Sequence, residues 1–171
     1  MKTQINTLLK LGVLTIGAVL TSGANAASDT ATASAEIIAP IAISKSVDMN
    51  FGQIVSGAGA STIVLTPAGA RSVGSGDATL GNATGVTAAS FAVTGEGTNT
   101  YAITLPSSVT LDNNATGTMT ADTFTSNPSG TGTLTAGAQT LTVGATLNVG
   151  ASQESGSYSS DTPFTVTVEY N

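Results

Sequence analysis

The sequence contains no histidine and no cysteine, and this double absence removes several kinds of site at once. Histidine is the usual general base near neutral pH, and cysteine supplies both a thiolate nucleophile and a soft metal ligand. A Ser-His-Asp triad cannot be built without histidine, although serine is plentiful. We therefore expect that the protein is not an enzyme and that it holds no metal and no cofactor.

Tryptophan is also absent, and aromatic residues make up only 4% of the chain. The ten acidic residues could place two carboxylates at a separation suited to glycoside hydrolysis, but few aromatic faces are present to hold a sugar. Residues 112–114, which read Asp-Asn-Asn, and the loop around Asp77 could supply oxygen ligands to calcium, yet neither has the EF-hand spacing. We interpret both as turns and leave calcium binding open.

The first 26 residues match a secretory signal peptide. Lys2 and Lys10 flank a polar start, residues 11–20 form an apolar run, and residues 24–26 read Ala-Asn-Ala, a small-x-small cleavage pattern. The apolar run is shorter than the roughly 20 residues that a membrane-spanning helix needs. We predict that residues 1–26 are removed and that the rest is exported to the periplasm and then the cell surface, without membrane insertion.

Removal of the signal would leave 145 residues, enough for one domain with a hydrophobic core. Lys45 and Arg71 would then stand against ten acidic residues, which gives a net charge of −8. Nucleic acids and anionic membrane surfaces are poor partners for such a chain, because both are bound through clustered lysine and arginine. Without cysteine, stability must come from packing and sheet hydrogen bonds rather than disulfides.

The pattern of apolar residues predicts an all-β fold. No stretch after the signal shows sustained helical periodicity, whereas apolar and polar residues alternate over short runs that end at glycine, asparagine, aspartate or proline. About eight to ten short strands with frequent turns are typical of an antiparallel immunoglobulin-like sandwich. A closed barrel with a similar number of strands is the structural alternative. We assign residues 36–171 to this domain.

Residues 162–171 show a clear strand pattern at the end of the chain. Phe164, Val166, Val168 and Tyr170 alternate with polar residues, so an extended backbone places all four on one face. We expect this segment to be a half-buried strand around which the core closes.

Other segments predict a longer strand and a hairpin. The longest clean alternation runs over residues 141–149 and is interrupted only by Gly144. Residues 91–105 predict a hairpin closed by a loop at residues 95–99, which is rich in glycine. A change of phase near Asp122 indicates a bulge.

Residues 27–35 form a lead-in of small residues before the domain. Ala31, Ala33, Ala35 and Ile37 occupy alternate positions, so they would share one face of an extended segment. We expect this extension to be either flexible or able to pair as a strand, in its own chain or in a neighbour.

Two internal segments have sequences typical of one family of small exported bacterial domains. They are residues 65–71 (Leu-Thr-Pro-Ala-Gly-Ala-Arg) and 101–106 (Tyr-Ala-Ile-Thr-Leu-Pro). The chain from residue 37 to residue 171 resembles the family called domain of unknown function 4402. No activity follows from that resemblance.

The end of the chain carries a second resemblance. Residues 158–171, with a penultimate tyrosine at Tyr170, resemble the last strand of chaperone-usher pilins and of their spore-coat-U-like relatives. Residues 37–41 (Ile-Ile-Ala-Pro-Ile) and 49–54 (Met-Asn-Phe-Gly-Gln-Ile) are similar to the first strands of such subunits. This resemblance implies a pilin-like sandwich that lacks one strand and is completed by an extended segment of a neighbouring subunit. It implies a fimbrial fibre made of copies of this chain, with a periplasmic chaperone and an usher as further partners.

The pilin resemblance also implies roles for individual residues. The assembly groove and the edge covered by a chaperone would be lined by Phe164, Val166, Val168 and Tyr170. The donated segment would be formed by Ala31, Ala33, Ala35 and Ile37.

A second hypothesis is a self-complete secreted or periplasmic sandwich that binds a ligand or a matrix component through its loops. Residues 74–85 and 112–114 are the loops concerned. Pairing of every central strand within the chain would favour this hypothesis. Arg71 is expected to pair with Asp77 or to cap a loop.

Overall fold

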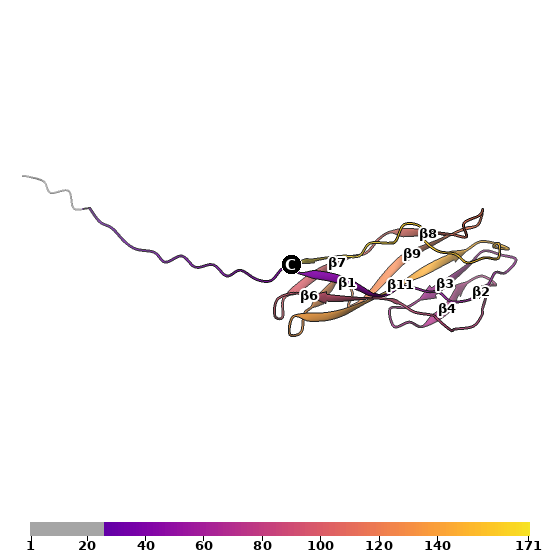
Figure 1. Ribbon diagram of the computed structural model, residues 1–171, viewed down its shortest axis with the longest axis horizontal. Helices are drawn as coiled ribbons and strands as arrows, with labels where there is room; N and C mark the ends of the chain where they lie inside the picture. Colours follow the sequence, from indigo (N-terminus) through magenta and orange to yellow (C-terminus); the bar gives the residue numbers. More distant parts are fainter. Residues whose placement is uncertain (1–25) are drawn as a thin grey trace, which may run out of the picture. The chain divides into compact units, whose positions relative to one another are not determined.

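The structure, a computed structural model, describes residues 26–171 and is an antiparallel β-sandwich without a helix among those residues (Figure 1). The chain divides into two units, residues 1–36 and 37–171. In the first unit, residues 26–36 are exposed and belong to no strand. Most of the predicted signal peptide, residues 1–25, lies outside the described residues.

The second unit contains all of the strands. The strands of the described residues are β1 (Ala42–Val47), β2 (Ile54–Val55), β3 (Ser61–Leu65), β4 (Arg71–Ser75), β5 (Thr79–Leu80), β6 (Ala89–Thr94), β7 (Thr100–Thr104), β8 (Ser108–Asp112), β9 (Thr118–Asn127), β10 (Thr131–Thr133), β11 (Ala138–Val149) and β12 (Thr167–Tyr170). They outnumber the expected eight to ten because β2, β5 and β10 are only two or three residues long.

Strand β11 is the centre of the large sheet. One of its edges pairs with β9, which in turn pairs with β8. Its other edge is shared, because residues 138–143 pair with β6 and residues 145–149 pair with β3. Strand β1 continues the sheet beyond β6, and β4 continues it beyond β3. The long alternation in the sequence therefore marks the strand that connects both halves of this sheet.

A smaller sheet has the order β10-β7-β12, and β2 pairs with β5 in a separate two-stranded ladder. The large and small sheets have separate edges, which excludes the closed-barrel alternative. Both sheets are antiparallel, and the predicted sandwich class is confirmed.

Two apolar clusters form the core. The first lies between the small sheet and the half of the large sheet that contains β6; its buried members are Ala89, Phe91, Val93, Tyr101, Leu134, Leu141, Val143, Val166 and Val168. The second lies on the half that contains β3, β8 and β9; its buried members are Phe51, Ile63, Leu65, Ala78, Ala121, Ala145, Leu147 and Val149. The small sheet contributes no buried residue to the second cluster.

The predicted hairpin over residues 91–105 is wrong. Strand β6 pairs with β1 and β11, whereas β7 pairs with β10 and β12, so the two strands lie in different sheets. The loop between them bonds to another turn, since Gly95 N–H donates to Gly137 O and Gly137 N–H donates to Gly97 O. A short glycine-rich loop fits a crossover between sheets as well as a hairpin, and these nonlocal bonds select the crossover.

The terminal strand is shorter than expected. It begins at Thr167 rather than at residue 162, although the burial pattern alternates from Phe164 onward. The bulge predicted near Asp122 is confirmed, because Thr123 has a φ of 48° and the β9–β11 register shifts between Gly144 and Thr146.

Candidate functional site

An apolar groove of about 1060 Å³ crosses the large sheet over the second core cluster. Its floor is the inward face of β8, β9 and β11. The floor residues are Val109, Leu111, Met119, Ala121, Leu147 and Val149. The first wall consists of residues 47–56, and the second wall consists of residues 153–160 and 163–164. Neither wall belongs to the small sheet, so irregular segments cover this half of the sandwich.

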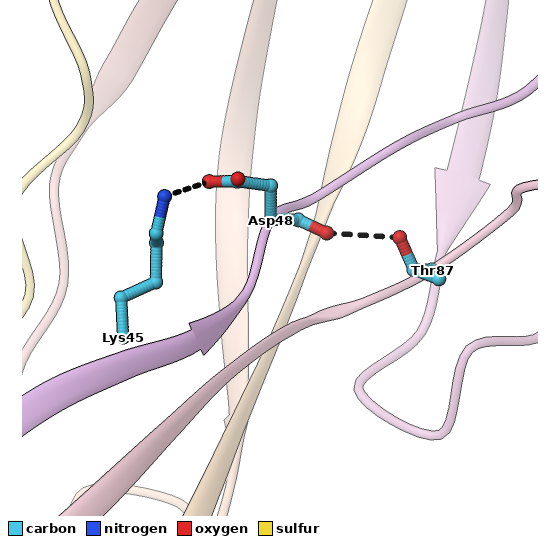
Figure 2. Close-up of polar contacts among 3 residues, drawn as sticks. All are labelled: Lys45, Asp48 and Thr87. Atoms are coloured by element: carbon cyan, nitrogen blue, oxygen red, sulfur yellow. Dashed lines mark hydrogen bonds and ion pairs between the residues drawn. The ribbon is translucent and has the colours of Figure 1, made fainter.

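The first wall is fixed to the edge of the large sheet near β6. Lys45 Nζ lies 2.6 Å from Asp48 Oδ1, and Asp48 O accepts a hydrogen bond from Thr87 Oγ1 at 2.8 Å (Figure 2). Asn50 and Thr87 exchange two backbone hydrogen bonds. These contacts hold the segment in place at the point where it leaves β1.

Arg71 holds the lower part of the first wall. Its guanidinium donates to the carbonyl oxygens of Phe51 and Gln53, and also to those of Gly81 and Asn82. A guanidinium is a planar fork with five N–H donors, which suits it to several carbonyls at once. The expectation that Arg71 caps a loop is therefore confirmed, and its carbonyl partners lie on two segments, residues 51–53 and 81–82.

Hydrogen bonds fix the first half of the second wall, whereas the backbone of its second half bonds to no other segment of the described residues. Gln153 Nε2 donates to the hydroxyl of Tyr158 at 2.8 Å, and Ser159 exchanges two backbone hydrogen bonds with Asp112. Among the described residues, no hydrogen bond joins the backbone of residues 160–165 to another segment. Apart from the N–H that Pro163 lacks, the N–H and C=O groups of this stretch are available to an added strand.

The predicted groove residues are split between the groove and the core. Phe164 is half-buried on the second wall, with its ring centroid 5.1 Å from that of Phe124. Val166 and Val168 are buried in the first cluster instead. The Tyr170 hydroxyl accepts a hydrogen bond from Glu96 N–H at 2.6 Å and donates one to Ala39 O at 3.1 Å. Only Phe164 of the four lines the groove.

The predicted donor residues belong to no strand of the chain. Ala31, Ala33 and Ala35 are exposed. Ile37 is 98% exposed, the largest value among the exposed large apolar side chains of residues 26–171.

The carboxylates of the two loops considered for ligand binding accept hydrogen bonds from backbone N–H groups of the chain itself. The Asp77 carboxylate accepts from the backbone N–H groups of Ala58 and Gly59. Asp112 Oδ1 accepts from Asn114 N–H at 2.9 Å. Within residues 26–171, no three Asp or Glu side chains lie close enough together to hold a metal ion. The same residues include no helix of the length and apolarity needed to span a membrane.

The floor of the groove was not found from the sequence. Its strands show ordinary period-two alternation, which predicts an inward face but not what covers that face. One feature of the sequence marks the first wall: Ile54 departs from the alternation of Val47, Met49 and Phe51. That change of phase coincides with Gly52, whose φ is +68° and which lies beside Arg71 Nη1.

Comparisons with known proteins identify the family of the chain. Residues 41–170 match the family described as "Domain of unknown function (DUF4402)". No curated protein matches the chain. No solved structure matches it.

Proposed function

The chain belongs to the DUF4402 family, and we propose that it is an exported, non-enzymatic subunit that assembles into a surface fibre by strand complementation. The family description states no activity, so the proposal rests on the fold. Its main support is the groove, whose apolar floor is covered by irregular segments rather than by the small sheet.

Strand addition fits the chemistry of this groove. An extended segment satisfies free backbone groups by main-chain hydrogen bonds and places alternate side chains on an apolar surface. The free backbone of residues 160–165 and the floor residues of β8, β9 and β11 provide both elements. When one end of a subunit fills a groove in the next, the contact is heterologous and builds a filament.

Export and helper proteins are part of the same proposal. The signal-like residues 1–26 would direct the chain to the periplasm. A groove that is to receive a strand would need protection before assembly, so a chaperone that covers it and an usher that exchanges the chaperone for the next subunit are the partners we propose.

The test is assembly of protein purified from cells that express the full sequence. We expect concentration-dependent oligomers by light scattering and fibres by electron microscopy. Deletion of residues 27–35 should leave monomers. If this deletion changes neither assembly nor stability, donation of the segment is wrong.

A matched pair of variants separates strand insertion from a general charge effect. Ala33→Asp with Ala35→Asp places two carboxylates on the face that would meet the floor. Thr32→Asp with Ser34→Asp adds the same charge on the opposite face. The first pair should abolish assembly and the second should largely preserve it, whereas equal loss in both would point to charge alone.

One observation favours a self-complete domain instead. Among the described residues, every strand inside a sheet has partners on both sides, namely β6, β11, β3, β9 and β7. Such a domain would bind a ligand or matrix component through its loops. It predicts a protein that stays monomeric at all concentrations, with unchanged stability after loss of residues 27–35.

A further inference from the structure

The loop between β8 and β9 carries an Asn-x-Thr motif at its tip, in residues 114–116. Asn113 N–H donates to Gly117 O at 3.1 Å, which closes the base of the loop. Residues 114–116 are all exposed and belong to no strand. In an exported protein, an asparagine followed two positions later by threonine is an acceptor motif for N-linked glycosylation, provided that the residue between them is not proline.

The two asparagines of this loop have different roles. Asn113 Oδ1 accepts from Ala115 N–H at 3.1 Å and from Gly117 N–H at 2.9 Å, so its side chain holds the loop together. Asn114 has a φ of 57°, and its own N–H donates to Asp112 Oδ1 at 2.9 Å. Among the described residues, no hydrogen bond engages the Asn114 side chain. The Asn114 amide can therefore react without loss of a contact that the fold uses.

Two further side chains of the loop suit recognition by an enzyme. Asp112 stands two positions before Asn114, where a basic group of a transferase can bind it through a strong charge-assisted hydrogen bond. Thr116 Oγ1 donates to Glu154 Oε2 at 3.0 Å, and this contact is exposed, so that water or a protein group can replace it. The segment thus offers one enzyme a carboxylate, an amide and a hydroxyl within five residues.

A second Asn-x-Thr motif, at Asn82, lacks these features. Leu80 rather than an acidic residue stands two positions before it. Asn82 Oδ1 accepts from both the N–H and the hydroxyl of Thr84, at 2.9 and 2.8 Å. A transferase would have to break both bonds to bind the amide and the hydroxyl. The chain therefore contains its own matched control.

We propose that Asn114 is an N-glycosylation site, modified after export by an oligosaccharyltransferase with a polyprenyl-diphosphate-linked oligosaccharide as donor. The amide nitrogen of Asn114 attacks the anomeric carbon of the first sugar, so a C–N bond forms and the bond from that carbon to the diphosphate oxygen breaks. Polyprenyl diphosphate leaves, and the nitrogen loses one proton to a base of the transferase. This inference goes beyond the fibre proposal and shares with it only the export of the chain.

Mass spectrometry of the protein recovered from the cells in which it is naturally made tests the site. A protease that cuts before aspartate releases residues 112–121, which contain Asn114, and residues 77–111, which contain Asn82. We expect an oligosaccharide on the first peptide, located at Asn114 by fragmentation that retains the sugar, and none on the second. An unmodified Asn114, or sugar only on the threonines of the first peptide, would overturn the inference.

Variants made in the same cells test which groups the transferase reads. Asp112→Asn keeps an oxygen that can accept from Asn114 N–H but removes the charge. It should lower the ratio of modified to unmodified protein about tenfold, the effect of losing one charge-assisted hydrogen bond. Thr116→Val should abolish modification, whereas Thr116→Ser and Asn82→Gln should retain it. Full modification of both Asp112→Asn and Thr116→Val would contradict recognition of this motif.

Assembly is a separate readout. Protein that forms fibres while Asn114 is unmodified would overturn this inference and leave the fibre proposal standing. Protein that is modified at Asn114 but remains monomeric under all conditions would do the reverse. Protein that stays inside the cell with residues 1–26 attached would overturn both.

Discussion

Gly144 lies directly against the carbonyl oxygen of Leu65, so closely that a Cβ at this position would overlap that oxygen. Gly144 is in the middle of β11, between the residues that pair with β6 and those that pair with β3. The end of β3 and the start of its following turn occupy the space that a side chain would need. This close approach allows one long strand to serve both halves of the large sheet.

Gly144→Ala should therefore destabilise the protein. The added methyl group meets backbone atoms of Leu65, Thr66 and Pro67, which cannot rotate away as a side chain can. Overpacking of this kind typically costs about 1–3 kcal/mol, and we expect the upper part of that range. Urea unfolding of the wild type and the variant measures it.

Gly59→Ala is the matched control for that substitution. Gly59 has an ordinary φ, and its nearest neighbour would lie 3.4 Å from the new Cβ, at the Asp77 carboxylate. We expect a change of about 1 kcal/mol or less. Equal losses at the two sites would mean that glycine content, rather than the contact with Leu65, controls stability.

Arg71→Lys should loosen the first wall of the groove. A lysine ammonium is a single point of charge and cannot reach carbonyls on both residues 51–53 and residues 81–82 in the geometry of a guanidinium fork. Hydrogen bonds to charged groups contribute about 1.5–3 kcal/mol, so we expect a loss of about 2 kcal/mol in the free energy of unfolding. Hydrogen exchange should also rise at Gly81 N–H, which donates to Gln53 O.

Lys45→Met is the comparison for Arg71→Lys, because Lys45 and Arg71 are the two basic residues that remain once the predicted signal peptide is removed. The side chains of Lys45 and Asp48 are 55% and 79% exposed, and exposed ion pairs contribute about 0–1 kcal/mol. We expect little change in stability. A larger loss than for Arg71→Lys would contradict the role assigned to the guanidinium.

Tyr101 should make stability fall at alkaline pH. Burial raises the pKa of Tyr101 above its ordinary value of 10.0, while its hydroxyl donates to Gln139 Oε1 at 2.8 Å. Above the unfolded pKa, the unfolded chain loses this proton and the folded chain keeps it. The free energy of unfolding should therefore be unaffected by this group below pH 10 and then decrease by up to about 1.4 kcal/mol per pH unit.

Tyr101→Phe checks the assignment. The ring stays in the core, and Gln139 Oε1 keeps its hydrogen bond from Thr133 N–H. Chemical unfolding between pH 9 and 11 should show a smaller alkaline loss in the variant. An identical loss in both proteins would assign the effect to other groups.

The exposed segment before Ala39 should be the first site of proteolysis. Residues 26–38 are exposed and lie outside every strand, so their backbone is accessible to a protease. Elastase, which cleaves after small residues, should trim the monomer before Ala39 and leave the sandwich intact, as N-terminal sequencing and mass spectrometry can show. Assembled protein should resist this trimming, and equal rates in monomer and assembly would contradict donation.

The period-two pattern determined which side chains face inward. Val166 and Val168 are both buried, although only Val168 lies within the terminal strand. Leu141, Val143, Leu147 and Val149 are buried along β11 as their alternation predicts. This part could be read from the sequence because the direction of a side chain in extended backbone depends only on its position in the chain.

The tertiary structure decided which backbones meet. Residues 95–99 have the composition of a hairpin loop, yet bonds between Gly95 and Gly137 make them a crossover between two sheets. The groove likewise exists because β12 contributes no residue to the second core cluster. Arg71 joins residues 51–53 to residues 81–82 because four of their carbonyl oxygens converge on its guanidinium. Every residue except proline carries the same backbone N–H and C=O groups, so their partners depend on long-range packing that no local pattern encodes.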